Sequence, residues 1–210
     1  MSDVVEVKKL DITATLKEGI EIGVKNIGPI LANVVLWALT VWIPYLNVGT
    51  TIGLMVGIVS KASKGEAISF TEIFDPKYRK YMGEFFLTCG LMGIGIAAGT
   101  AFFIIPGIVI GIAWSLALLL VIDKGKDPTE ALTLSNNRTY GNKVRIFGVY
   151  ILAGLIFFIA QTILMAIGGA TRNSGFIGFM GFIVVLTSLF EIFVFIGLQA
   201  SVYKQLAGDA

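Results

Sequence analysis

The sequence predicts an all-α fold, a polytopic membrane helix bundle with six transmembrane helices arranged as three hairpins. Mean hydropathy is +0.85, and 14% of the residues are charged, against about 25% in typical soluble domains. Long apolar runs separate the charges, and one run, residues 82–122, carries Glu84 as its only charge. As a single helix this run would be about 60 Å long, roughly twice the hydrocarbon thickness of a bilayer. It must therefore fold back, and we expect the turn at Pro106-Gly107.

Six apolar segments account for the predicted spans. They are Gly28–Tyr45, Leu46–Ser60, Gly83–Ile105, Pro106–Ile122, Ile146–Gly169 and Phe176–Ala200. The first, third, fifth and sixth are long enough to cross a bilayer, whereas the second and fourth need local thinning or burial among other helices. The chain thus divides into a cytoplasmic amphipathic lead-in (residues 1–27), a six-span transmembrane domain (28–200) and a cytoplasmic tail (201–210).

The basic residues predict the orientation. All 16 except Arg172 fall in the lead-in, in the connections after the second and fourth spans, or in the tail. Because short cytoplasmic segments carry the excess of Lys and Arg, we expect a multi-pass membrane protein with both termini in the cytoplasm. Trp42 and Tyr45 would then lie at the outer end of the first hairpin, and Arg79 in a cytoplasmic connection. We expect no removable signal peptide, because the first 25 residues lack an uninterrupted apolar core.

Short amphipathic helices are expected on the cytoplasmic side before the first, third and fifth spans. Apolar residues recur at helical spacing over residues 16–27, which is typical of a helix at the membrane surface or beneath the bundle. Residues 69–72 have the pattern of a capping box. The segment Asp127–Glu130 predicts a third helix, with an N-cap and a proline at its start, that ends at Tyr140 before Gly141.

The spacing of the turns suggests a repeat. Pro44 and Pro106 lie 62 residues apart, and the third turn, near Gly168–Gly175, lies about the same distance further on but has no proline. The pattern predicts either a structural repeat or simply three hairpins of similar length.

Glycines four residues apart recur in the spans, among them Gly49 and Gly53, and Gly107 and Gly111. Small residues at this spacing allow helix backbones to approach closely. We favour a role in helix packing, with close approach to a substrate or a dimer partner as the alternative.

Glu191 is the most informative polar residue of the predicted spans. It lies about nine residues from the cytoplasmic end of the last span, where an ionised carboxylate costs several kcal/mol unless it is paired or hydrated. It would either bind a cation or relay a proton, or it would be a structural carboxyl group bonded to a neighbouring helix. Gln161 and Asn33 complete the candidate intramembrane polar site, although neutral amides are more easily satisfied by other helices.

The residue inventory argues against enzyme chemistry. The sequence has no histidine and a single cysteine, Cys89, which excludes Ser-His and Cys-His catalytic pairs, histidine metal sites and an internal disulfide. No glycine loop of the phosphate-binding G-x-x-x-x-G-K-[ST] type is present. Glu84 and Glu191 could act as an acid–base pair, but they lie on different predicted spans. We therefore expect no catalytic, cofactor-binding or metal-binding residues, and no nucleic-acid binding, because the basic residues follow the topology.

One stretch has a familiar pattern. Residues 102–147 combine an Ile-Pro-Gly turn, a small-residue helix, and then Ala131-Leu132, Ser135 and Gly141 before the next span. This combination resembles the poorly characterised prokaryotic six-helix integral membrane proteins related to the membrane domain of some glycerophosphoryl diester phosphodiesterases, and residues 16–29 are similar to their lead-in. The resemblance implies the six-helix fold and a location in a prokaryotic cytoplasmic (inner) membrane. It implies no activity, because its motifs are structural and the sequence contains no catalytic phosphodiesterase domain.

The sequence leaves several functions open. The first is a non-enzymatic inner-membrane scaffold or accessory subunit in envelope or lipid homeostasis, with membrane lipids, other membrane proteins or a second copy of the chain as partners. The second is a small, oligomeric transporter or channel with Glu191 on its pathway. A lipid-modifying enzyme comes third.

Overall fold

The computed structural model describes residues 9–171 and 173–209. Residues 1–8 of the predicted lead-in, Arg172 and Ala210 lie outside the described residues. Within these two ranges every regular element is helical and no strand forms. The predicted all-α fold is confirmed.

The helical elements follow one another with short connections. They are α1 (Ile12–Lys25), α2 (Ile27–Thr40), α3 (Leu46–Ile52), η1 (Gly53–Gly57), α4 (Ile58–Lys64), η2 (Glu72–Phe74), α5 (Lys77–Lys80), α6 (Met82–Phe102), α7 (Ile104–Ala113), α8 (Ala117–Lys124), α9 (Pro128–Thr139), α10 (Lys143–Gly169) and α11 (Ser174–Ala207). η1 is a single π-helical turn, and it joins α3 and α4 into one continuous helix.

Several helices have the dimensions of membrane spans. Among the described residues, α6, the α7–α8 pair, α10 and α11 are long and apolar enough to cross a bilayer. α1 and α2 would make a fifth candidate if this pair, bent by 70°, counted as one span. The chain is therefore a multi-pass membrane protein by the length and composition of its helices, with four or five candidate spans.

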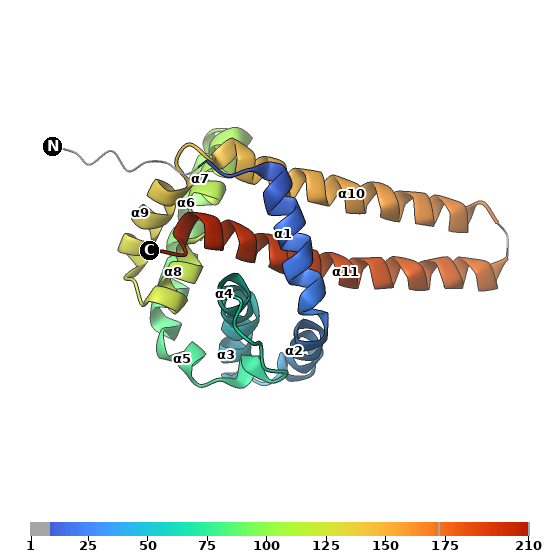
Figure 1. Cartoon of the computed structure of the whole chain (residues 1–210), viewed down its shortest axis with the longest axis horizontal. Coiled ribbons are helices and arrows are strands. Elements are labelled where there is room, and N and C mark those ends of the chain that lie inside the picture. Colours follow the sequence, from blue (N-terminus) through green and yellow to red (C-terminus); the bar gives the residue numbers. More distant parts are fainter. Residues whose placement is uncertain (1–8, 172, 210) are drawn as a thin grey trace.

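The last two helices form a long hairpin that reaches away from the rest of the chain (Figure 1). All of the buried residues of α11 lie between Phe193 and Ala207, so its outer half has none. The outer half of the hairpin instead exposes large apolar side chains such as Phe158 and Phe182. Residues 201–207 of the predicted tail continue α11 and are mostly buried, because this last stretch packs into the core at the root of the hairpin.

α1 crosses α11 in close backbone contact (Figure 1). A Cβ atom added to Gly197 would lie 2.7 Å from the backbone nitrogen of Gly23, and one added to Gly19 would lie 2.8 Å from the Cα atom of Leu198. The buried face of α1 is therefore the face with small residues, namely Thr15, Gly19 and Gly23. The apolar residues that predicted this helix are only partly covered, with Ile20 and Val24 more than 40% exposed.

The connection from α4 to α6 corrects one expectation about the first hairpin. We expected Tyr45 and Arg79 at opposite surfaces of the membrane, but the Arg79 guanidinium carbon lies 5.9 Å from the centre of the Tyr45 ring. They meet because η2 and α5 run back along α3 and η1, where glycines leave room. A Cβ atom on Gly53 would lie 2.8 Å from the Cα atom of Ile73, and one on Gly49 would lie 2.8 Å from the Arg79 side chain.

The turn between α6 and α7 lies at Phe103, three residues before the position predicted for it. Phe103 is extended, with φ −161° and ψ 154°, and α7 begins at the next residue. Pro106 and Gly107 thus belong to the first turns of α7. A proline is tolerated there, because the first backbone N–H groups of a helix have no partner within the helix.

α9 packs where α7 ends and α8 begins. The Ser135 hydroxyl accepts from the Leu116 backbone N–H at 3.1 Å and donates to the Ala113 carbonyl oxygen at 2.7 Å. Both backbone groups belong to the break between the two helices. α9 begins at Pro128 as predicted, but the side chain of its N-cap residue Asp127 makes no capping hydrogen bond. It ends at Thr139, followed by Gly141 with φ 75°.

Candidate functional site

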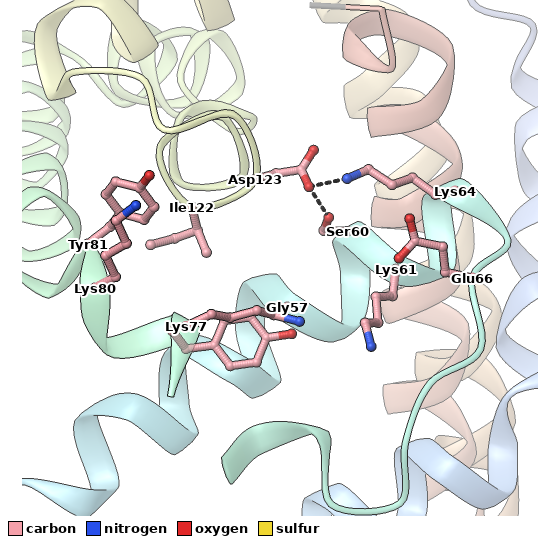
Figure 2. A pocket seen from close by; sticks show the side chains of 11 residues that line it. Gly57, Ser60, Lys61, Lys64, Glu66, Lys77, Lys80, Tyr81, Ile122 and Asp123 are labelled. Atoms are coloured by element: carbon pink, nitrogen blue, oxygen red, sulfur yellow. Dashed lines mark hydrogen bonds and ion pairs between the residues drawn. The ribbon is translucent and has the colours of Figure 1, made fainter. Parts of the chain in front are cut away.

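A polar pocket lies between α4, α5 and α8, near the C-terminal ends of α4 and α8. Its volume is about 360 Å³, and four lysines, two carboxylates, Ser60 and Tyr81 are prominent in its lining. Lys64 and Asp123 face each other on one side, and Lys80 and Tyr81 lie on the other side of Ile122 (Figure 2). The pocket is the strongest candidate site within the described residues, because charged side chains from distant segments converge on it.

Glu72 anchors one wall of this pocket. Its side chain is 2% exposed and accepts hydrogen bonds from the Lys61 ammonium at 2.7 Å, the Lys77 ammonium at 3.1 Å and the Tyr78 hydroxyl at 2.6 Å. Burial by itself raises the pKa of this carboxyl group, but the three hydrogen bonds outweigh it and lower the pKa to about 2. The carboxylate therefore stays ionised at neutral pH and holds α4 to α5.

Asp123 anchors the opposite wall. Its side chain is 5% exposed and forms an ion pair with Lys64. The same carboxylate accepts from the Ser60 hydroxyl at 2.5 Å and from the Tyr203 hydroxyl at 2.9 Å. One carboxylate thus joins α4, α8 and α11, and it fixes the position of the Lys64 ammonium at the pocket (Figure 2).

A third carboxylate joins the first helix to the last. Glu18 on α1 accepts hydrogen bonds from the Ser201 hydroxyl and the Lys204 ammonium, both at 2.6 Å, and from the Gln205 amide at 3.1 Å. Like Asp123, it links segments that are far apart in sequence, whereas the partners of Glu72 all lie within 11 residues of it. Glu18, Glu72, Asp123 and their partners are together called the polar junction. Among the described side chains, no buried nitrogen or oxygen atom lacks a hydrogen-bond partner, so the buried polar groups of this junction satisfy one another.

Asn33 supports the first hairpin and lies apart from the other candidate polar residues. It is fully buried, and its amide nitrogen donates to the carbonyl oxygens of Pro29 and Ser69, both at 2.8 Å. Its amide oxygen accepts from the Ile73 backbone N–H at 3.0 Å. Asn33 therefore holds the returning connection against α2, which is a structural role.

Glu191 and Gln161, two of the candidate polar residues, lie in contact with each other. The Gln161 amide nitrogen lies 3.1 Å from a Glu191 carboxylate oxygen and 3.2 Å from the Ser188 hydroxyl. All three residues belong to the α10–α11 hairpin. The arrangement matches the structural alternative for Glu191, a carboxyl group bonded to a neighbouring helix.

The predicted packing and turn residues differ in how tightly they are enclosed. A Cβ atom on Gly107 would collide with the Thr100 side chain, whereas one on Gly111 would meet only Ile96 at an ordinary 3.8 Å. Close packing thus applies to Gly107, as it does to Gly49 and Gly53, but not to Gly111. Pro44 lies in the turn before α3, where its carbonyl oxygen accepts from the Leu46 N–H at 2.8 Å.

Sequence reasoning missed the three anchoring carboxylates. Glu72 carried the only local signal, as the last residue of the capping box, and it does accept a long 3.4 Å hydrogen bond from the Ser69 N–H. Asp123 directly follows a predicted span and precedes Lys124, and Glu18 lies among lysines of the lead-in. Both positions are typical of solvated membrane-boundary residues, and only the folded chain brings their partners to them.

No family model, no curated protein and no solved structure matches this chain. The resemblance to proteins related to phosphodiesterase membrane domains therefore stays a prediction.

Proposed function

We propose that the chain is a non-enzymatic scaffold or accessory subunit of a prokaryotic cytoplasmic membrane, acting in envelope or lipid homeostasis. The observation that carries this proposal is the contrast between the two parts of the molecule. In the polar junction the carboxylates and lysines bond to one another and hold the helices together. The α10–α11 hairpin reaches away from it, so its outer half is free to contact lipids, other membrane proteins or a second copy (Figure 1).

The contacts of the first hairpin favour four crossings rather than six. The continuous helix from α3 to α4 has Lys64 beside Asp123, at the inner end of α8, and Gly49 beside Arg79, just before α6 begins. Since both ends of this helix lie near the inner ends of candidate spans, it would run along the inner face of the membrane. Both termini are cytoplasmic in this arrangement, and the basic residues of the segment before α6 stay inside.

Cysteine labelling decides between the two topologies. In a chain with Cys89→Ala, single cysteines at Asn47, Thr129 and Asn173 are tested for reaction with a membrane-impermeant reagent in intact cells. Four crossings predict that only Asn173→Cys reacts, whereas the six-span layout predicts that Asn47→Cys reacts as well. Reaction of Thr129→Cys from outside would contradict both layouts and the cytoplasmic placement of the junction.

The surroundings of Glu191 favour a scaffold over a channel. The carboxylate is bonded to Gln161 within one hairpin. A pathway past it would require helices from further copies of the chain, because the buried face of α11 begins only at Phe193. A carboxylate at this depth is costly unless it is paired, and Gln161 supplies the pairing within the chain. In a scaffold, Glu191 therefore has to form only this hydrogen bond and does not have to bind and release an ion or a proton.

Two substitutions at this residue test the proposal. Glu191→Gln keeps the volume and can still hydrogen-bond, so the protein should melt as the wild type does and retain its co-purifying partners. Glu191→Leu removes one of the two hydrogen bonds of the Gln161 amide nitrogen, which keeps the Ser188 hydroxyl as a partner. It should lower the unfolding free energy by about 0.5–1.5 kcal/mol. Phe190→Leu, a neighbouring change at an exposed apolar residue, serves as the control. Ion or proton flux in wild-type liposomes that Glu191→Gln abolishes would instead establish the channel.

A further inference from the structure

The lining of the pocket between α4, α5 and α8 has more lysines than carboxylates. Lys61, Lys64, Lys77 and Lys80 line it together with only two carboxylates, Glu66 and Asp123. Glu72 and Asp75 pair with Lys61 and Lys77 from outside the lining and make the two charges equal in number. A concave site of this kind attracts anions where a lysine has no carboxylate partner, because the low-dielectric walls focus the field of the unpaired charge.

The lysines are not equally engaged. Lys61 and Lys77 donate to Glu72, and Lys64 pairs with Asp123. Lys77 also pairs with Asp75 at 2.9 Å. Lys80 is exposed and, among residues 9–171 and 173–209, forms no ion pair. Its ammonium group lies 5.0 Å from the centre of the Tyr81 ring. Lys80 is thus a cation at the pocket whose charge is not neutralised by the protein.

The remaining donors are held in place. Asp123 bonds to three side chains, so it fixes Lys64 at the pocket while leaving that ammonium further N–H donors. Lys64 is 39% exposed. The two ammonium groups come from different elements, on opposite sides of the opening (Figure 2). Two separated cations around a space of about 360 Å³ suit a compact anion with several acceptor oxygens.

The position of the pocket indicates where such an anion would come from. Ile122 and Asp123 end the candidate span Ile104–Lys124, and Tyr81 directly precedes α6. These residues lie at the level where tyrosines meet the lipid headgroups. Basic pockets between helices on this side of a membrane bind phosphate-bearing headgroups.

We propose that this pocket binds a phosphate group, with Lys80 as its main ligand and Lys64 as a second one. The phosphate group is shared by anionic lipid headgroups and by free phosphate compounds. The proposal goes beyond the scaffold function and does not depend on it, since phosphate binding and partner binding are measured separately.

Binding to the purified full chain in an uncharged detergent tests the proposal. The probes are phosphatidic acid, phosphatidylcholine and inorganic phosphate, with bound lipid measured by native mass spectrometry and competition by inorganic phosphate. Three variants are compared, namely Lys80→Gln, Lys80→Arg and, as a control, Lys126→Gln, which removes an equal charge outside this pocket. Thermal melts of each variant establish that it is folded.

Phosphatidic acid should bind in preference to phosphatidylcholine, and Lys80→Gln should weaken its binding about tenfold or more, as expected for the loss of a charged hydrogen bond. Lys80→Arg and Lys126→Gln should leave the binding close to that of the wild type. Displacement of the lipid by millimolar inorganic phosphate would identify free phosphate compounds as the source, and no displacement would identify the headgroup. Equal weakening by Lys80→Gln and Lys126→Gln, or no preference for phosphatidic acid, would overturn the proposal.

Discussion

Gly197 lies at the crossing of α1 and α11, where the two backbones touch, and its replacement by alanine is the sharpest test of the fold. The added Cβ atom would lie 2.7 Å from the Gly23 nitrogen and closer still to the Gly19 carbonyl oxygen. Ordinary contact begins at 3.4 Å, so the helices must separate by at least 0.7 Å. The opposing atoms belong to the backbone of a helix, which cannot rotate away as a side chain can.

The expected cost follows from this geometry. Overpacking of a close contact costs about 1–3 kcal/mol, and we expect Gly197→Ala near the upper end, because separation of the helices also strains the hydrogen bonds of Glu18 to α11. For a chain of this length, 3 kcal/mol corresponds to a fall in melting temperature of about 6–12 °C. Thermal unfolding in one detergent, followed by circular dichroism, measures it.

Gly178→Ala is the matched control, because it makes the same chemical change in the same helix. No atom lies within 4 Å of a Cβ atom at this position, and alanine favours a helix over glycine by up to about 1 kcal/mol. This variant should melt at or slightly above the wild-type temperature. If Gly197→Ala melts at the same temperature as Gly178→Ala, α1 does not cross α11 as described and the close backbone contact between the two helices is refuted.

Three further changes probe other parts of the molecule. Gly107→Ala should lower the melting temperature, because the added atom meets a side chain of α6, and Gly111→Ala, with only an ordinary contact, should not; equal effects would contradict the packing described for this hairpin. The folded-state pKa of Glu72 is depressed to about 2, so its contribution is complete above its unfolded pKa of about 4.5 and is lost as the pH falls towards 2. Between pH 6 and pH 3 the wild type should therefore lose on the order of 2 kcal/mol more stability than Glu72→Gln, with allowance for solvent screening. If the unfolding free energies of the two proteins fall in parallel with pH, the ion pairs of Glu72 contribute nothing. Ser135→Ala should cost about 1–3 kcal/mol, because it leaves the Leu116 backbone N–H at the α7–α8 break without its partner. The exposed Thr133→Ala should be neutral in the same melts.

Local signals in the sequence were enough to predict much of the helix content. The long apolar runs predicted α6, the α7–α8 pair, α10 and α11, because hydropathy over about 20 residues depends on composition alone. The start of α9 at Pro128 and its end before Gly141 followed from residues whose preferences act within one helical turn. The sequence named Glu191 and Gln161 as candidate polar residues but did not predict that they meet.

The sequence by itself determined that this is a helical membrane protein and which long segments are candidate spans, because those properties depend on neighbours along the chain. The tertiary structure decided which face of α1 is buried, where the first hairpin lies relative to Arg79, and what Glu72 and Asp123 do. The sequence around a carboxylate among lysines is the same whether the carboxylate is solvated or hydrogen-bonded on all sides. The role of Asp123 is set by partners such as Tyr203, which lies on a helix far along the chain, and only folding brings the two within hydrogen-bond distance.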